Sequence, residues 1–127
     1  MTNNTNLLEY NDKVLEFFGT KILDKRYYKR EANIQIYFGK ECLSSQILPE
    51  VLQLYMASYF AKDAFGVECH SGQFRKIKFS NLIKPNKTFQ LKLELGKQNI
   101  NYTYFDDEII YSSGQLPTIN HLRNFHI

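Results

Sequence analysis

The feature that most constrains this chain is a run of apolar residues from Pro49 to Phe65 with the period of a helix. Proline is favoured in a first helical turn because its missing N–H would have no partner there, and Glu50 suits the positive end of the helix dipole. Gly66 is a typical helix stop. The apolar residues cover more than one stripe, which is typical of an enclosed helix. The sequence therefore predicts one central helix that organises the fold.

Segments on both sides of this helix alternate apolar and polar residues, as strands do. Before the helix, Lys21–Arg30 is charged and Tyr-rich, and Ile34–Phe38 alternates more regularly. Four further strands are predicted after it: Phe74–Ile83, Phe89–Leu95, Ile100–Phe105 and Ile109–Ser113. Their short connections predict antiparallel neighbours in a four-strand meander. This order of elements predicts an α+β domain.

Length and composition indicate one domain over residues 1–127, which is enough chain to bury a core without disulfides. We expect residues 1–19 to be an N-terminal arm or short helix and residues 117–127 to be a polar tail. The formal net charge of +3 is too small to indicate nucleic acid. The apolar run is too short and too polar to span a membrane. With no signal-peptide pattern, we expect a cytoplasmic protein with reduced thiols.

Three local patterns resemble one enzyme family. Ile47–Leu54 reads I-L-P-E-V-L-Q-L and resembles the P-[IV]-[LM]-P-G-V-x-Q-L-[DE] segment of β-hydroxyacyl-acyl carrier protein dehydratases. Phe74–Asn86 resembles the family's F-x-x-[IV]-K-F strand and its [IV]-x-P-G-D turn, and Ser112–Leu116 resembles its closing S-S-G-x-[LI]. The likeness is best to small stand-alone dehydratase-like proteins of aryl polyene and related pathways. It implies the hotdog fold, an antiparallel sheet wrapped around one long central helix.

The resemblance also marks three candidate catalytic positions. In such dehydratases a His removes the α-proton and an acid on the helix protonates the departing hydroxyl. Aligned on Leu48 and Pro49, the His position holds Glu41 and the helix-acid position holds Tyr55. Glu41 is either a substitute base or a solvated loop carboxylate, and Tyr55 is either a proton donor or a core residue. Glu50 is either a thioesterase-type carboxylate or a first-turn residue favoured by the dipole.

The resemblance predicts two further groups of residues. Residues around the helix start would contact the acyl chain: Leu48, Pro49, Val51, Met56 and Tyr59. Basic residues near the following strand would meet an acidic acyl carrier protein, unless they form an ordinary solvated strand face: Arg75, Lys76, Lys78 and Lys84. The implied ligand is an acyl chain carried by acyl carrier protein or by CoA.

The remaining reactive residues carry weaker patterns. Cys42 with His70 as its base is a possible nucleophilic pair, but the two are distant in sequence. Adding Cys69 does not complete a zinc motif, so we expect neither metal nor cofactor. His121 and His126 lie in the polar tail.

Three functions are therefore open. The first is a dehydratase-like hotdog protein that acts on or binds 3-hydroxyacyl thioesters. The second is an acyl-thioester hydrolase. The third is a non-catalytic partner of an active hotdog dehydratase. We expect a homodimer, with a heterodimer as the alternative that fits the third function.

Overall fold

Six strands and one helix make up the part of the chain that the structure, a computed structural model, describes: residues 19–39, 47–69 and 73–119. Two strands precede the helix: β1 (Thr20–Tyr27) and β2 (Glu31–Phe38). The helix and the remaining strands are α2 (Glu50–Phe65), β3 (Arg75–Phe79), β4 (Lys87–Leu95), β5 (Asn99–Phe105) and β6 (Ile110–Pro117).

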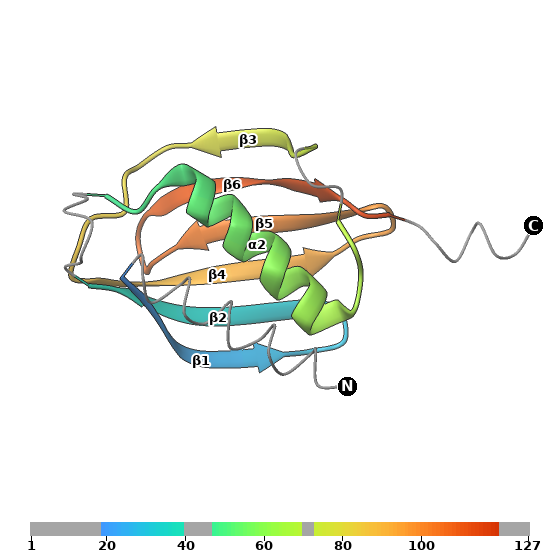
Figure 1. Ribbon diagram of the computed structural model, residues 1–127, viewed down its shortest axis with the longest axis horizontal. Coiled ribbons are helices and arrows are strands. Elements are labelled where there is room, and N and C mark those ends of the chain that lie inside the picture. Colours follow the sequence, from blue (N-terminus) through green and yellow to red (C-terminus); the bar gives the residue numbers. More distant parts are fainter. Residues whose placement is uncertain (1–18, 40–46, 70–72, 120–127) are drawn as a thin grey trace, which may run out of the picture.

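The strands form one antiparallel sheet in the order β1-β2-β4-β5-β6-β3. Helix α2 lies across one face of this sheet, and its N-terminal end is near β3 (Figure 1). The prediction of an α+β domain with an antiparallel sheet around one helix is confirmed. The described residues contain no helix that is both long and apolar enough to cross a membrane.

The prediction of a four-strand meander is wrong for its first strand, β3. β3 does not pair with β4 but with β6, and so occupies the outer position of the sheet. The segment between β3 and β4 crosses the end of the sheet. There Ile83 is buried, and its carbonyl oxygen accepts a hydrogen bond from the Leu48 N–H (2.8 Å). The backbone N–H groups of Ser80 and Asn81 both donate to the Tyr111 carbonyl. The apolar Ile83 therefore anchors a crossover and does not extend a strand.

Helix α2 begins and ends where the sequence predicts. Pro49 is the N-cap, and Gly66 ends the helix in the left-handed region (φ 69°), with its N–H donating to the Lys62 carbonyl. The prediction that the helix is enclosed holds for one face only. Facing the sheet, α2 buries six side chains: Leu52, Gln53, Met56, Ala57, Phe60 and Ala61. On the opposite face the Val51 side chain is 77% exposed.

The core lies between this inner face of α2 and the sheet. Alternate residues of the central strands point toward the helix, and the strand register places Ile34 opposite Leu91 and Leu93 opposite Tyr102. Fully burying one such side chain contributes roughly 1.5–3 kcal/mol before the entropy cost of ordering it. Packing against the helix therefore fixes the register of the sheet.

Several expected features lie outside the described residues. They include most of the N-terminal arm (residues 1–18), the end of the C-terminal tail (residues 120–127), and Glu41, Cys42, His70, His121 and His126. The last strand is longer than predicted, because β6 continues beyond Ser113 to Pro117.

Candidate functional site

A buried glutamine, Gln53, ties the start of α2 to the sheet. Its Oε1 accepts a hydrogen bond from Ser112 Oγ (2.7 Å), and its Nε2 donates to the Leu48 carbonyl (3.3 Å). Its own carbonyl oxygen accepts from the Tyr104 hydroxyl (2.6 Å). A buried amide is costly unless it is paired, so these contacts define how the N-terminal turns of α2 sit on β5 and β6.

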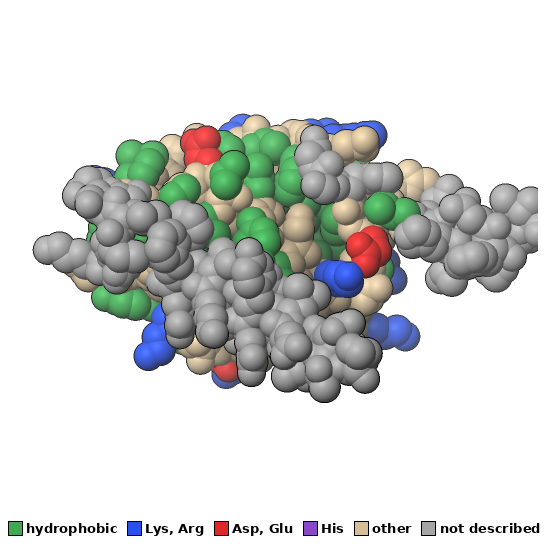
Figure 2. All heavy atoms as spheres, viewed as in Figure 1, with side chains coloured by type: hydrophobic (Ala, Val, Ile, Leu, Met, Phe, Trp, Pro, Cys, Tyr) green, Lys and Arg blue, Asp and Glu red, His purple; other side chains and the backbone are tan. Residues whose placement is uncertain are grey.

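An apolar groove opens on the other face of the helix. We call it the α2–β3 groove, and it has a volume of about 480 Å³. Its lining residues are Val51, Leu54, Tyr55, Ser58, Cys69, Phe74 and Ile77. Figure 2 shows hydrophobic side chains gathered between α2 and the rim formed by β3. A concave, mostly apolar surface with a few polar groups is typical of a site for an apolar ligand.

Tyr55, the residue at the helix-acid position of the dehydratase pattern, lines this groove. Its ring is half-buried and stacks on the ring of Tyr59, with 6.4 Å between centroids and 8° between planes. The structure places Tyr55 at the groove, where it also packs against the edge of the core. The base position, Glu41, lies outside the described residues.

Glu50 lies apart from Tyr55. It is exposed in the first turn of α2 and borders a smaller hollow of about 100 Å³. Leu48, Gln53 and Phe79 also line this hollow. The first N–H groups of the helix have no partner within it, so this end combines N–H donors that the helix does not use with one carboxylate.

The residues expected to contact an acyl chain occupy three different environments. Val51 lines the α2–β3 groove. Leu48 and Met56 are buried in the core of the same chain, 1% and 0% exposed. Pro49 and Tyr59 are half-buried, Pro49 at the N-cap of α2 and Tyr59 against Tyr55. A ligand in the groove would therefore meet Val51 and Tyr55 before any of the others.

The predicted basic group is exposed. It comprises Arg75, Lys76 and Lys78 on β3 and Lys84 on the crossover to β4. None of them forms an ion pair within the described residues. Lys76 has a positive φ of 53°, at an irregularity in the pairing with β6. Lys and Arg side chains appear along the β3 rim in Figure 2, so an outer strand beside the groove carries concentrated positive charge.

Cys69 also lines the groove, and its thiol is half-buried. Burial, with a smaller contribution from Glu68, raises the pKa of this thiol to about 11. The thiol is therefore protonated at neutral pH, and a protonated thiol is a poor nucleophile.

A second hollow lies on the face of the sheet away from α2. This β1–β4 groove has a volume of about 430 Å³ and is polar. Its lining residues are Asp24, Arg26, Tyr28, Asn33, Gln35 and Gln90. The Arg26 Nε already donates to Asp24 Oδ2 (3.0 Å). We favour the α2–β3 groove as the functional site because it is apolar and holds the residue at the helix-acid position.

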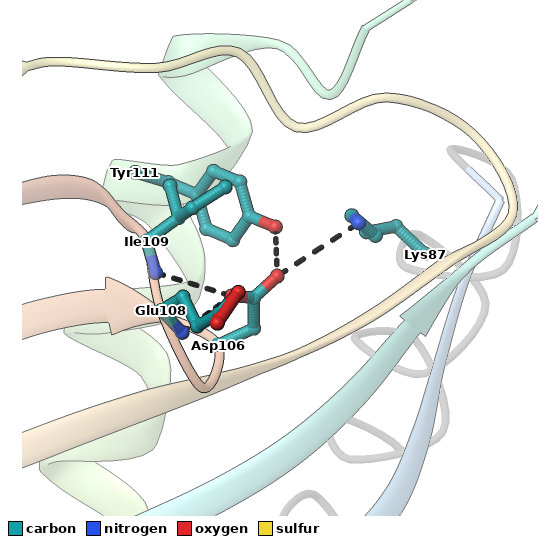
Figure 3. Close-up of polar contacts among 5 residues, drawn as sticks. All are labelled: Lys87, Asp106, Glu108, Ile109 and Tyr111. Atoms are coloured by element: carbon teal, nitrogen blue, oxygen red, sulfur yellow. Dashed lines mark hydrogen bonds and ion pairs between the residues drawn. The ribbon is translucent and has the colours of Figure 1, made fainter.

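Asp106 forms the densest polar cluster of the β5–β6 turn (Figure 3). One carboxylate oxygen accepts from the Tyr111 hydroxyl and lies 3.9 Å from Lys87 Nζ. The other accepts from the N–H groups of Glu108 and Ile109 (3.2 Å each). The Tyr111 hydrogen bond is the main reason that the pKa of Asp106 is lowered. These contacts connect the turn to β4 and β6, so we assign the cluster a structural role.

An antiparallel sheet around one helix, with an apolar groove on the outer side of that helix, defines this chain as a hotdog-fold protein. The sequence model of the ApeI-like family, described as ApeI dehydratase, matches residues 43–115. The match covers more than half of the chain, and the chain belongs to this family. The family resemblance and the fold predicted from the sequence are thereby confirmed. No curated protein matches the chain.

Solved structures agree on the fold. The dehydratase heterocomplex ApeI:P from Xenorhabdus doucetiae matches with a TM-score of 0.66 and 20% identity, over 79% of this chain and 97% of that one. The Escherichia coli PaaI protein of the phenylacetic acid degradation operon gives 0.60 and 14%, over 91% and 94%. Mouse thioesterase superfamily member 2 gives 0.65 and 9%, over 91% and 92%. At these identities the likeness is to the fold.

Sequence reasoning did not single out Gln53 as a structural anchor. The signal was present, since Gln53 is a polar residue on the helix face that the apolar pattern assigns to the core. A buried Gln needs partners, but the partners, Ser112 and Tyr104, are more than 50 residues away. Their identity follows only from the fold.

Proposed function

We propose that this chain is a dehydratase-like hotdog subunit that binds 3-hydroxyacyl thioesters in the α2–β3 groove. The observation that carries the proposal is the position of Tyr55. The residue that replaces the helix acid of the family faces an apolar groove of about 480 Å³. An acyl chain is apolar and needs such a surface, and its thioester and hydroxyl oxygens need a few polar partners.

Dehydration requires a base for the α-proton and a donor for the departing hydroxyl. On this chain the family positions offer Glu41 as the base and the Tyr55 hydroxyl as the donor. If this pair acts, the Glu41 carboxylate takes the α-proton, the C–O bond breaks, and the hydroxyl leaves as water with the proton from Tyr55. The product is the enoyl thioester. Binding needs the groove together with the Tyr55 hydroxyl, whereas turnover also needs the Glu41 carboxylate.

The test is a mass-spectrometric assay with 3-hydroxyacyl and saturated acyl thioesters on pantetheine, CoA and acyl carrier protein. We expect the chain to bind the 3-hydroxyacyl forms. Loss of water from them, abolished in Tyr55→Phe and in Glu41→Gln, would assign the dehydratase reaction. If the chain neither retains nor converts any thioester, the proposal is wrong.

A thioesterase is the second candidate, favoured by the position of Glu50. This carboxylate is exposed at the start of α2, where free helix N–H groups are available to stabilise an oxyanion. The candidate predicts release of free acid from acyl-CoA, and loss of that release in Glu50→Gln. Equal hydrolysis by the parent and the Glu50→Gln variant would exclude it.

We further propose that a second hotdog chain covers the α2–β3 groove. Val51 and Ile77 beside it are 77% and 39% exposed, and β3 is an outer strand. A two-fold antiparallel pairing of β3 with its own copy, centred on Ile77, places Lys76 of one copy opposite Lys78 of the other. Like charges in that arrangement are destabilising. The charge pattern therefore favours a different hotdog chain with an acidic edge strand over the homodimer expected from the sequence.

Sedimentation at two salt concentrations tests this preference. We expect self-association to be weak at low salt and to strengthen as salt screens the cations. Lys76→Glu should strengthen it at low salt, because the new carboxylate lies opposite Lys78. A tight homodimer at low salt, weakened by Lys76→Glu, would contradict the proposed pairing.

The basic group on β3 and Lys84 also supports docking of an acidic carrier protein in the cytoplasm. Electrostatic docking accelerates association and depends on salt. The double variant Lys78→Glu/Lys84→Glu should weaken binding of acyl-carrier protein and leave binding of the same acyl group on pantetheine unchanged. An equal effect on both forms would assign the cations to another role.

A further inference from the structure

The side-chain hydroxyl of Tyr102 is buried and has no hydrogen-bond partner among the residues that the structure describes. Tyr102 lies on β5, and its side chain is 1% exposed. Burial raises the pKa of this hydroxyl to about 12, so the group is a protonated donor at neutral pH. A buried hydroxyl without a partner costs stability that a phenylalanine would not cost. Such a group calls for a physical explanation.

The strand beside Tyr102 leaves room for its ring. Gly114 on β6 is the register partner of Tyr102. A Cβ atom at Gly114 would lie 2.7 Å from Tyr102 Cε2 and 2.8 Å from its hydroxyl oxygen. A side chain at this position would force the Tyr102 ring to shift, because the ring lies directly over the β6 backbone. The S-S-G-Q-L segment of the sequence thus includes the glycine that lets the hydroxyl reach across β6.

Tyr104, two residues further along the same strand, provides the contrast. Its hydroxyl is equally buried but donates to the Gln53 carbonyl oxygen at 2.6 Å. Both tyrosines point toward the helix side of the sheet, and their rings contact each other edge to face. Of these two neighbouring buried tyrosines, Tyr104 thus has a hydrogen-bond partner for its hydroxyl within the described residues, and Tyr102 has none.

One side chain, Phe74, connects the Tyr102 ring with the α2–β3 groove. Phe74 lines that groove and packs edge to face against the Tyr102 ring, with 6.4 Å between centroids. β6, over which the Tyr102 ring lies, is the strand next to β3. The groove and the Tyr102 ring thus contact the same side chain, Phe74.

We propose that the Tyr102 hydroxyl is a binding residue, held as a hydrogen-bond donor for a carbonyl or hydroxyl oxygen of an acyl ligand in the α2–β3 groove. The inference rests on the proposed function and adds a specificity to it. An oxygen-bearing acyl chain satisfies the donor, whereas an unsubstituted alkyl chain leaves it unpaired. The cost of the unpaired hydroxyl in the free protein is then recovered in the complex.

The test compares two probes in Tyr102→Phe and in the parent chain by titration calorimetry. One probe is the N-acetylcysteamine thioester of 3-hydroxydecanoic acid. The other is the decyl thioether of N-acetylcysteamine, which lacks the thioester carbonyl oxygen and the 3-hydroxyl group but keeps the acetamide. We expect Tyr102→Phe to bind the thioester about tenfold more weakly, the ratio that one net hydrogen bond supplies. Binding of the thioether should not change.

The thermal midpoint of the free protein supplies the second readout. Because Tyr102→Phe removes an unpaired hydroxyl, its midpoint should equal or exceed that of the parent. Tyr104→Phe is the matched control, since it removes a paired hydroxyl from the same layer. That variant should melt at a lower temperature and keep the parent's ratio of thioester to thioether affinity.

Three results would overturn the inference. Equal thioester affinity in the parent and Tyr102→Phe would show that the hydroxyl does not contact the ligand, while the proposed function stands. A midpoint lowered by Tyr102→Phe would show that the hydroxyl already has a partner in the free protein. If the parent binds neither probe, the inference and the proposed function fail together.

Discussion

The two faces of α2 are both rich in apolar and aromatic side chains, yet in the described part of the chain only one of them is fully buried. On the inner face, Met56 and Phe60 are 0% and 1% exposed and meet the sheet. On the outer face, Val51 is largely exposed and Tyr55 is half-buried beside an open groove. Exposed apolar surface beside a groove is typical of a ligand-binding site or a protein–protein interface. The inner face thus determines the fold, and we propose that the outer face is where a ligand or second chain binds.

The largest expected effect is on the inner face. Phe60→Ala removes a buried ring and should lower the free energy of unfolding by about 3–5 kcal/mol. Tyr59→Ala, the adjacent position on the outer side, should cost far less, because Tyr59 is only half-buried. Urea denaturation of both variants measures the difference. Equal losses would mean that the outer face also supports the fold, and the comparison would fail.

The next effect concerns the layer of the sheet beneath the inner face. Gly114→Ala places a Cβ against the Tyr102 ring, and overpacking of this kind typically costs about 1–3 kcal/mol. The double variant Gly114→Ala/Tyr102→Leu removes the ring that the new methyl group meets. It should cost less than the sum of the single variants in a double-mutant cycle. Strict additivity would show that the two residues do not interact.

The stability of the protein in acid should depend on Asp106, in the turn between β5 and β6. The folded-state pKa of Asp106 lies below its usual value of 3.8, mainly because the Tyr111 hydroxyl donates to it. Its contribution to stability is therefore present above pH 3.8 and is lost as pH falls through the lower, folded-state pKa. Asp106→Asn should destabilise the chain at neutral pH and flatten the loss of stability below pH 4. An unchanged profile in denaturation at several pH values would contradict this role.

The smallest effect on stability is expected on the outer face. Tyr55→Phe should change the free energy of unfolding by no more than about 0.5 kcal/mol, as is usual for positions that are not fully buried. It should nevertheless weaken binding of 3-hydroxyacyl thioesters, because the hydroxyl at the helix-acid position is lost. Parallel denaturation and binding measurements separate the two effects. A loss of stability as large as that of Phe60→Ala would assign Tyr55 to the core.

Much of the fold could be predicted because its signals are local. The apolar run, Pro49 and Gly66 determine where α2 begins and ends, and alternation determines the strands on either side. The place of β3 in the sheet could not be predicted this way. Ile83 was read as part of a strand because it is apolar, whereas its burial at the start of α2 depends on contacts between distant segments.

The candidate site was predictable only where family patterns are continuous in the sequence. Tyr55 could be placed on α2 by its distance from Pro49, and the structure puts it in a groove. The resemblance grouped Leu48 and Met56 with it, but helical geometry turns Met56 to the opposite, buried face of α2, and Leu48, which precedes the helix, is buried in the core. The pairing of Tyr102 with Gly114 depends on strand register, which no local pattern specifies.

The most direct test is a map of backbone and side-chain chemical shifts on titration with the N-acetylcysteamine thioester of 3-hydroxydecanoic acid. The central claim predicts shifts at Tyr55, Ser58 and Ile77 around the α2–β3 groove, and none at Asp24 or Gln35 in the β1–β4 groove. Shifts confined to the β1–β4 groove, or no shifts at saturating ligand, would contradict the assignment of the outer face of α2 as the binding site.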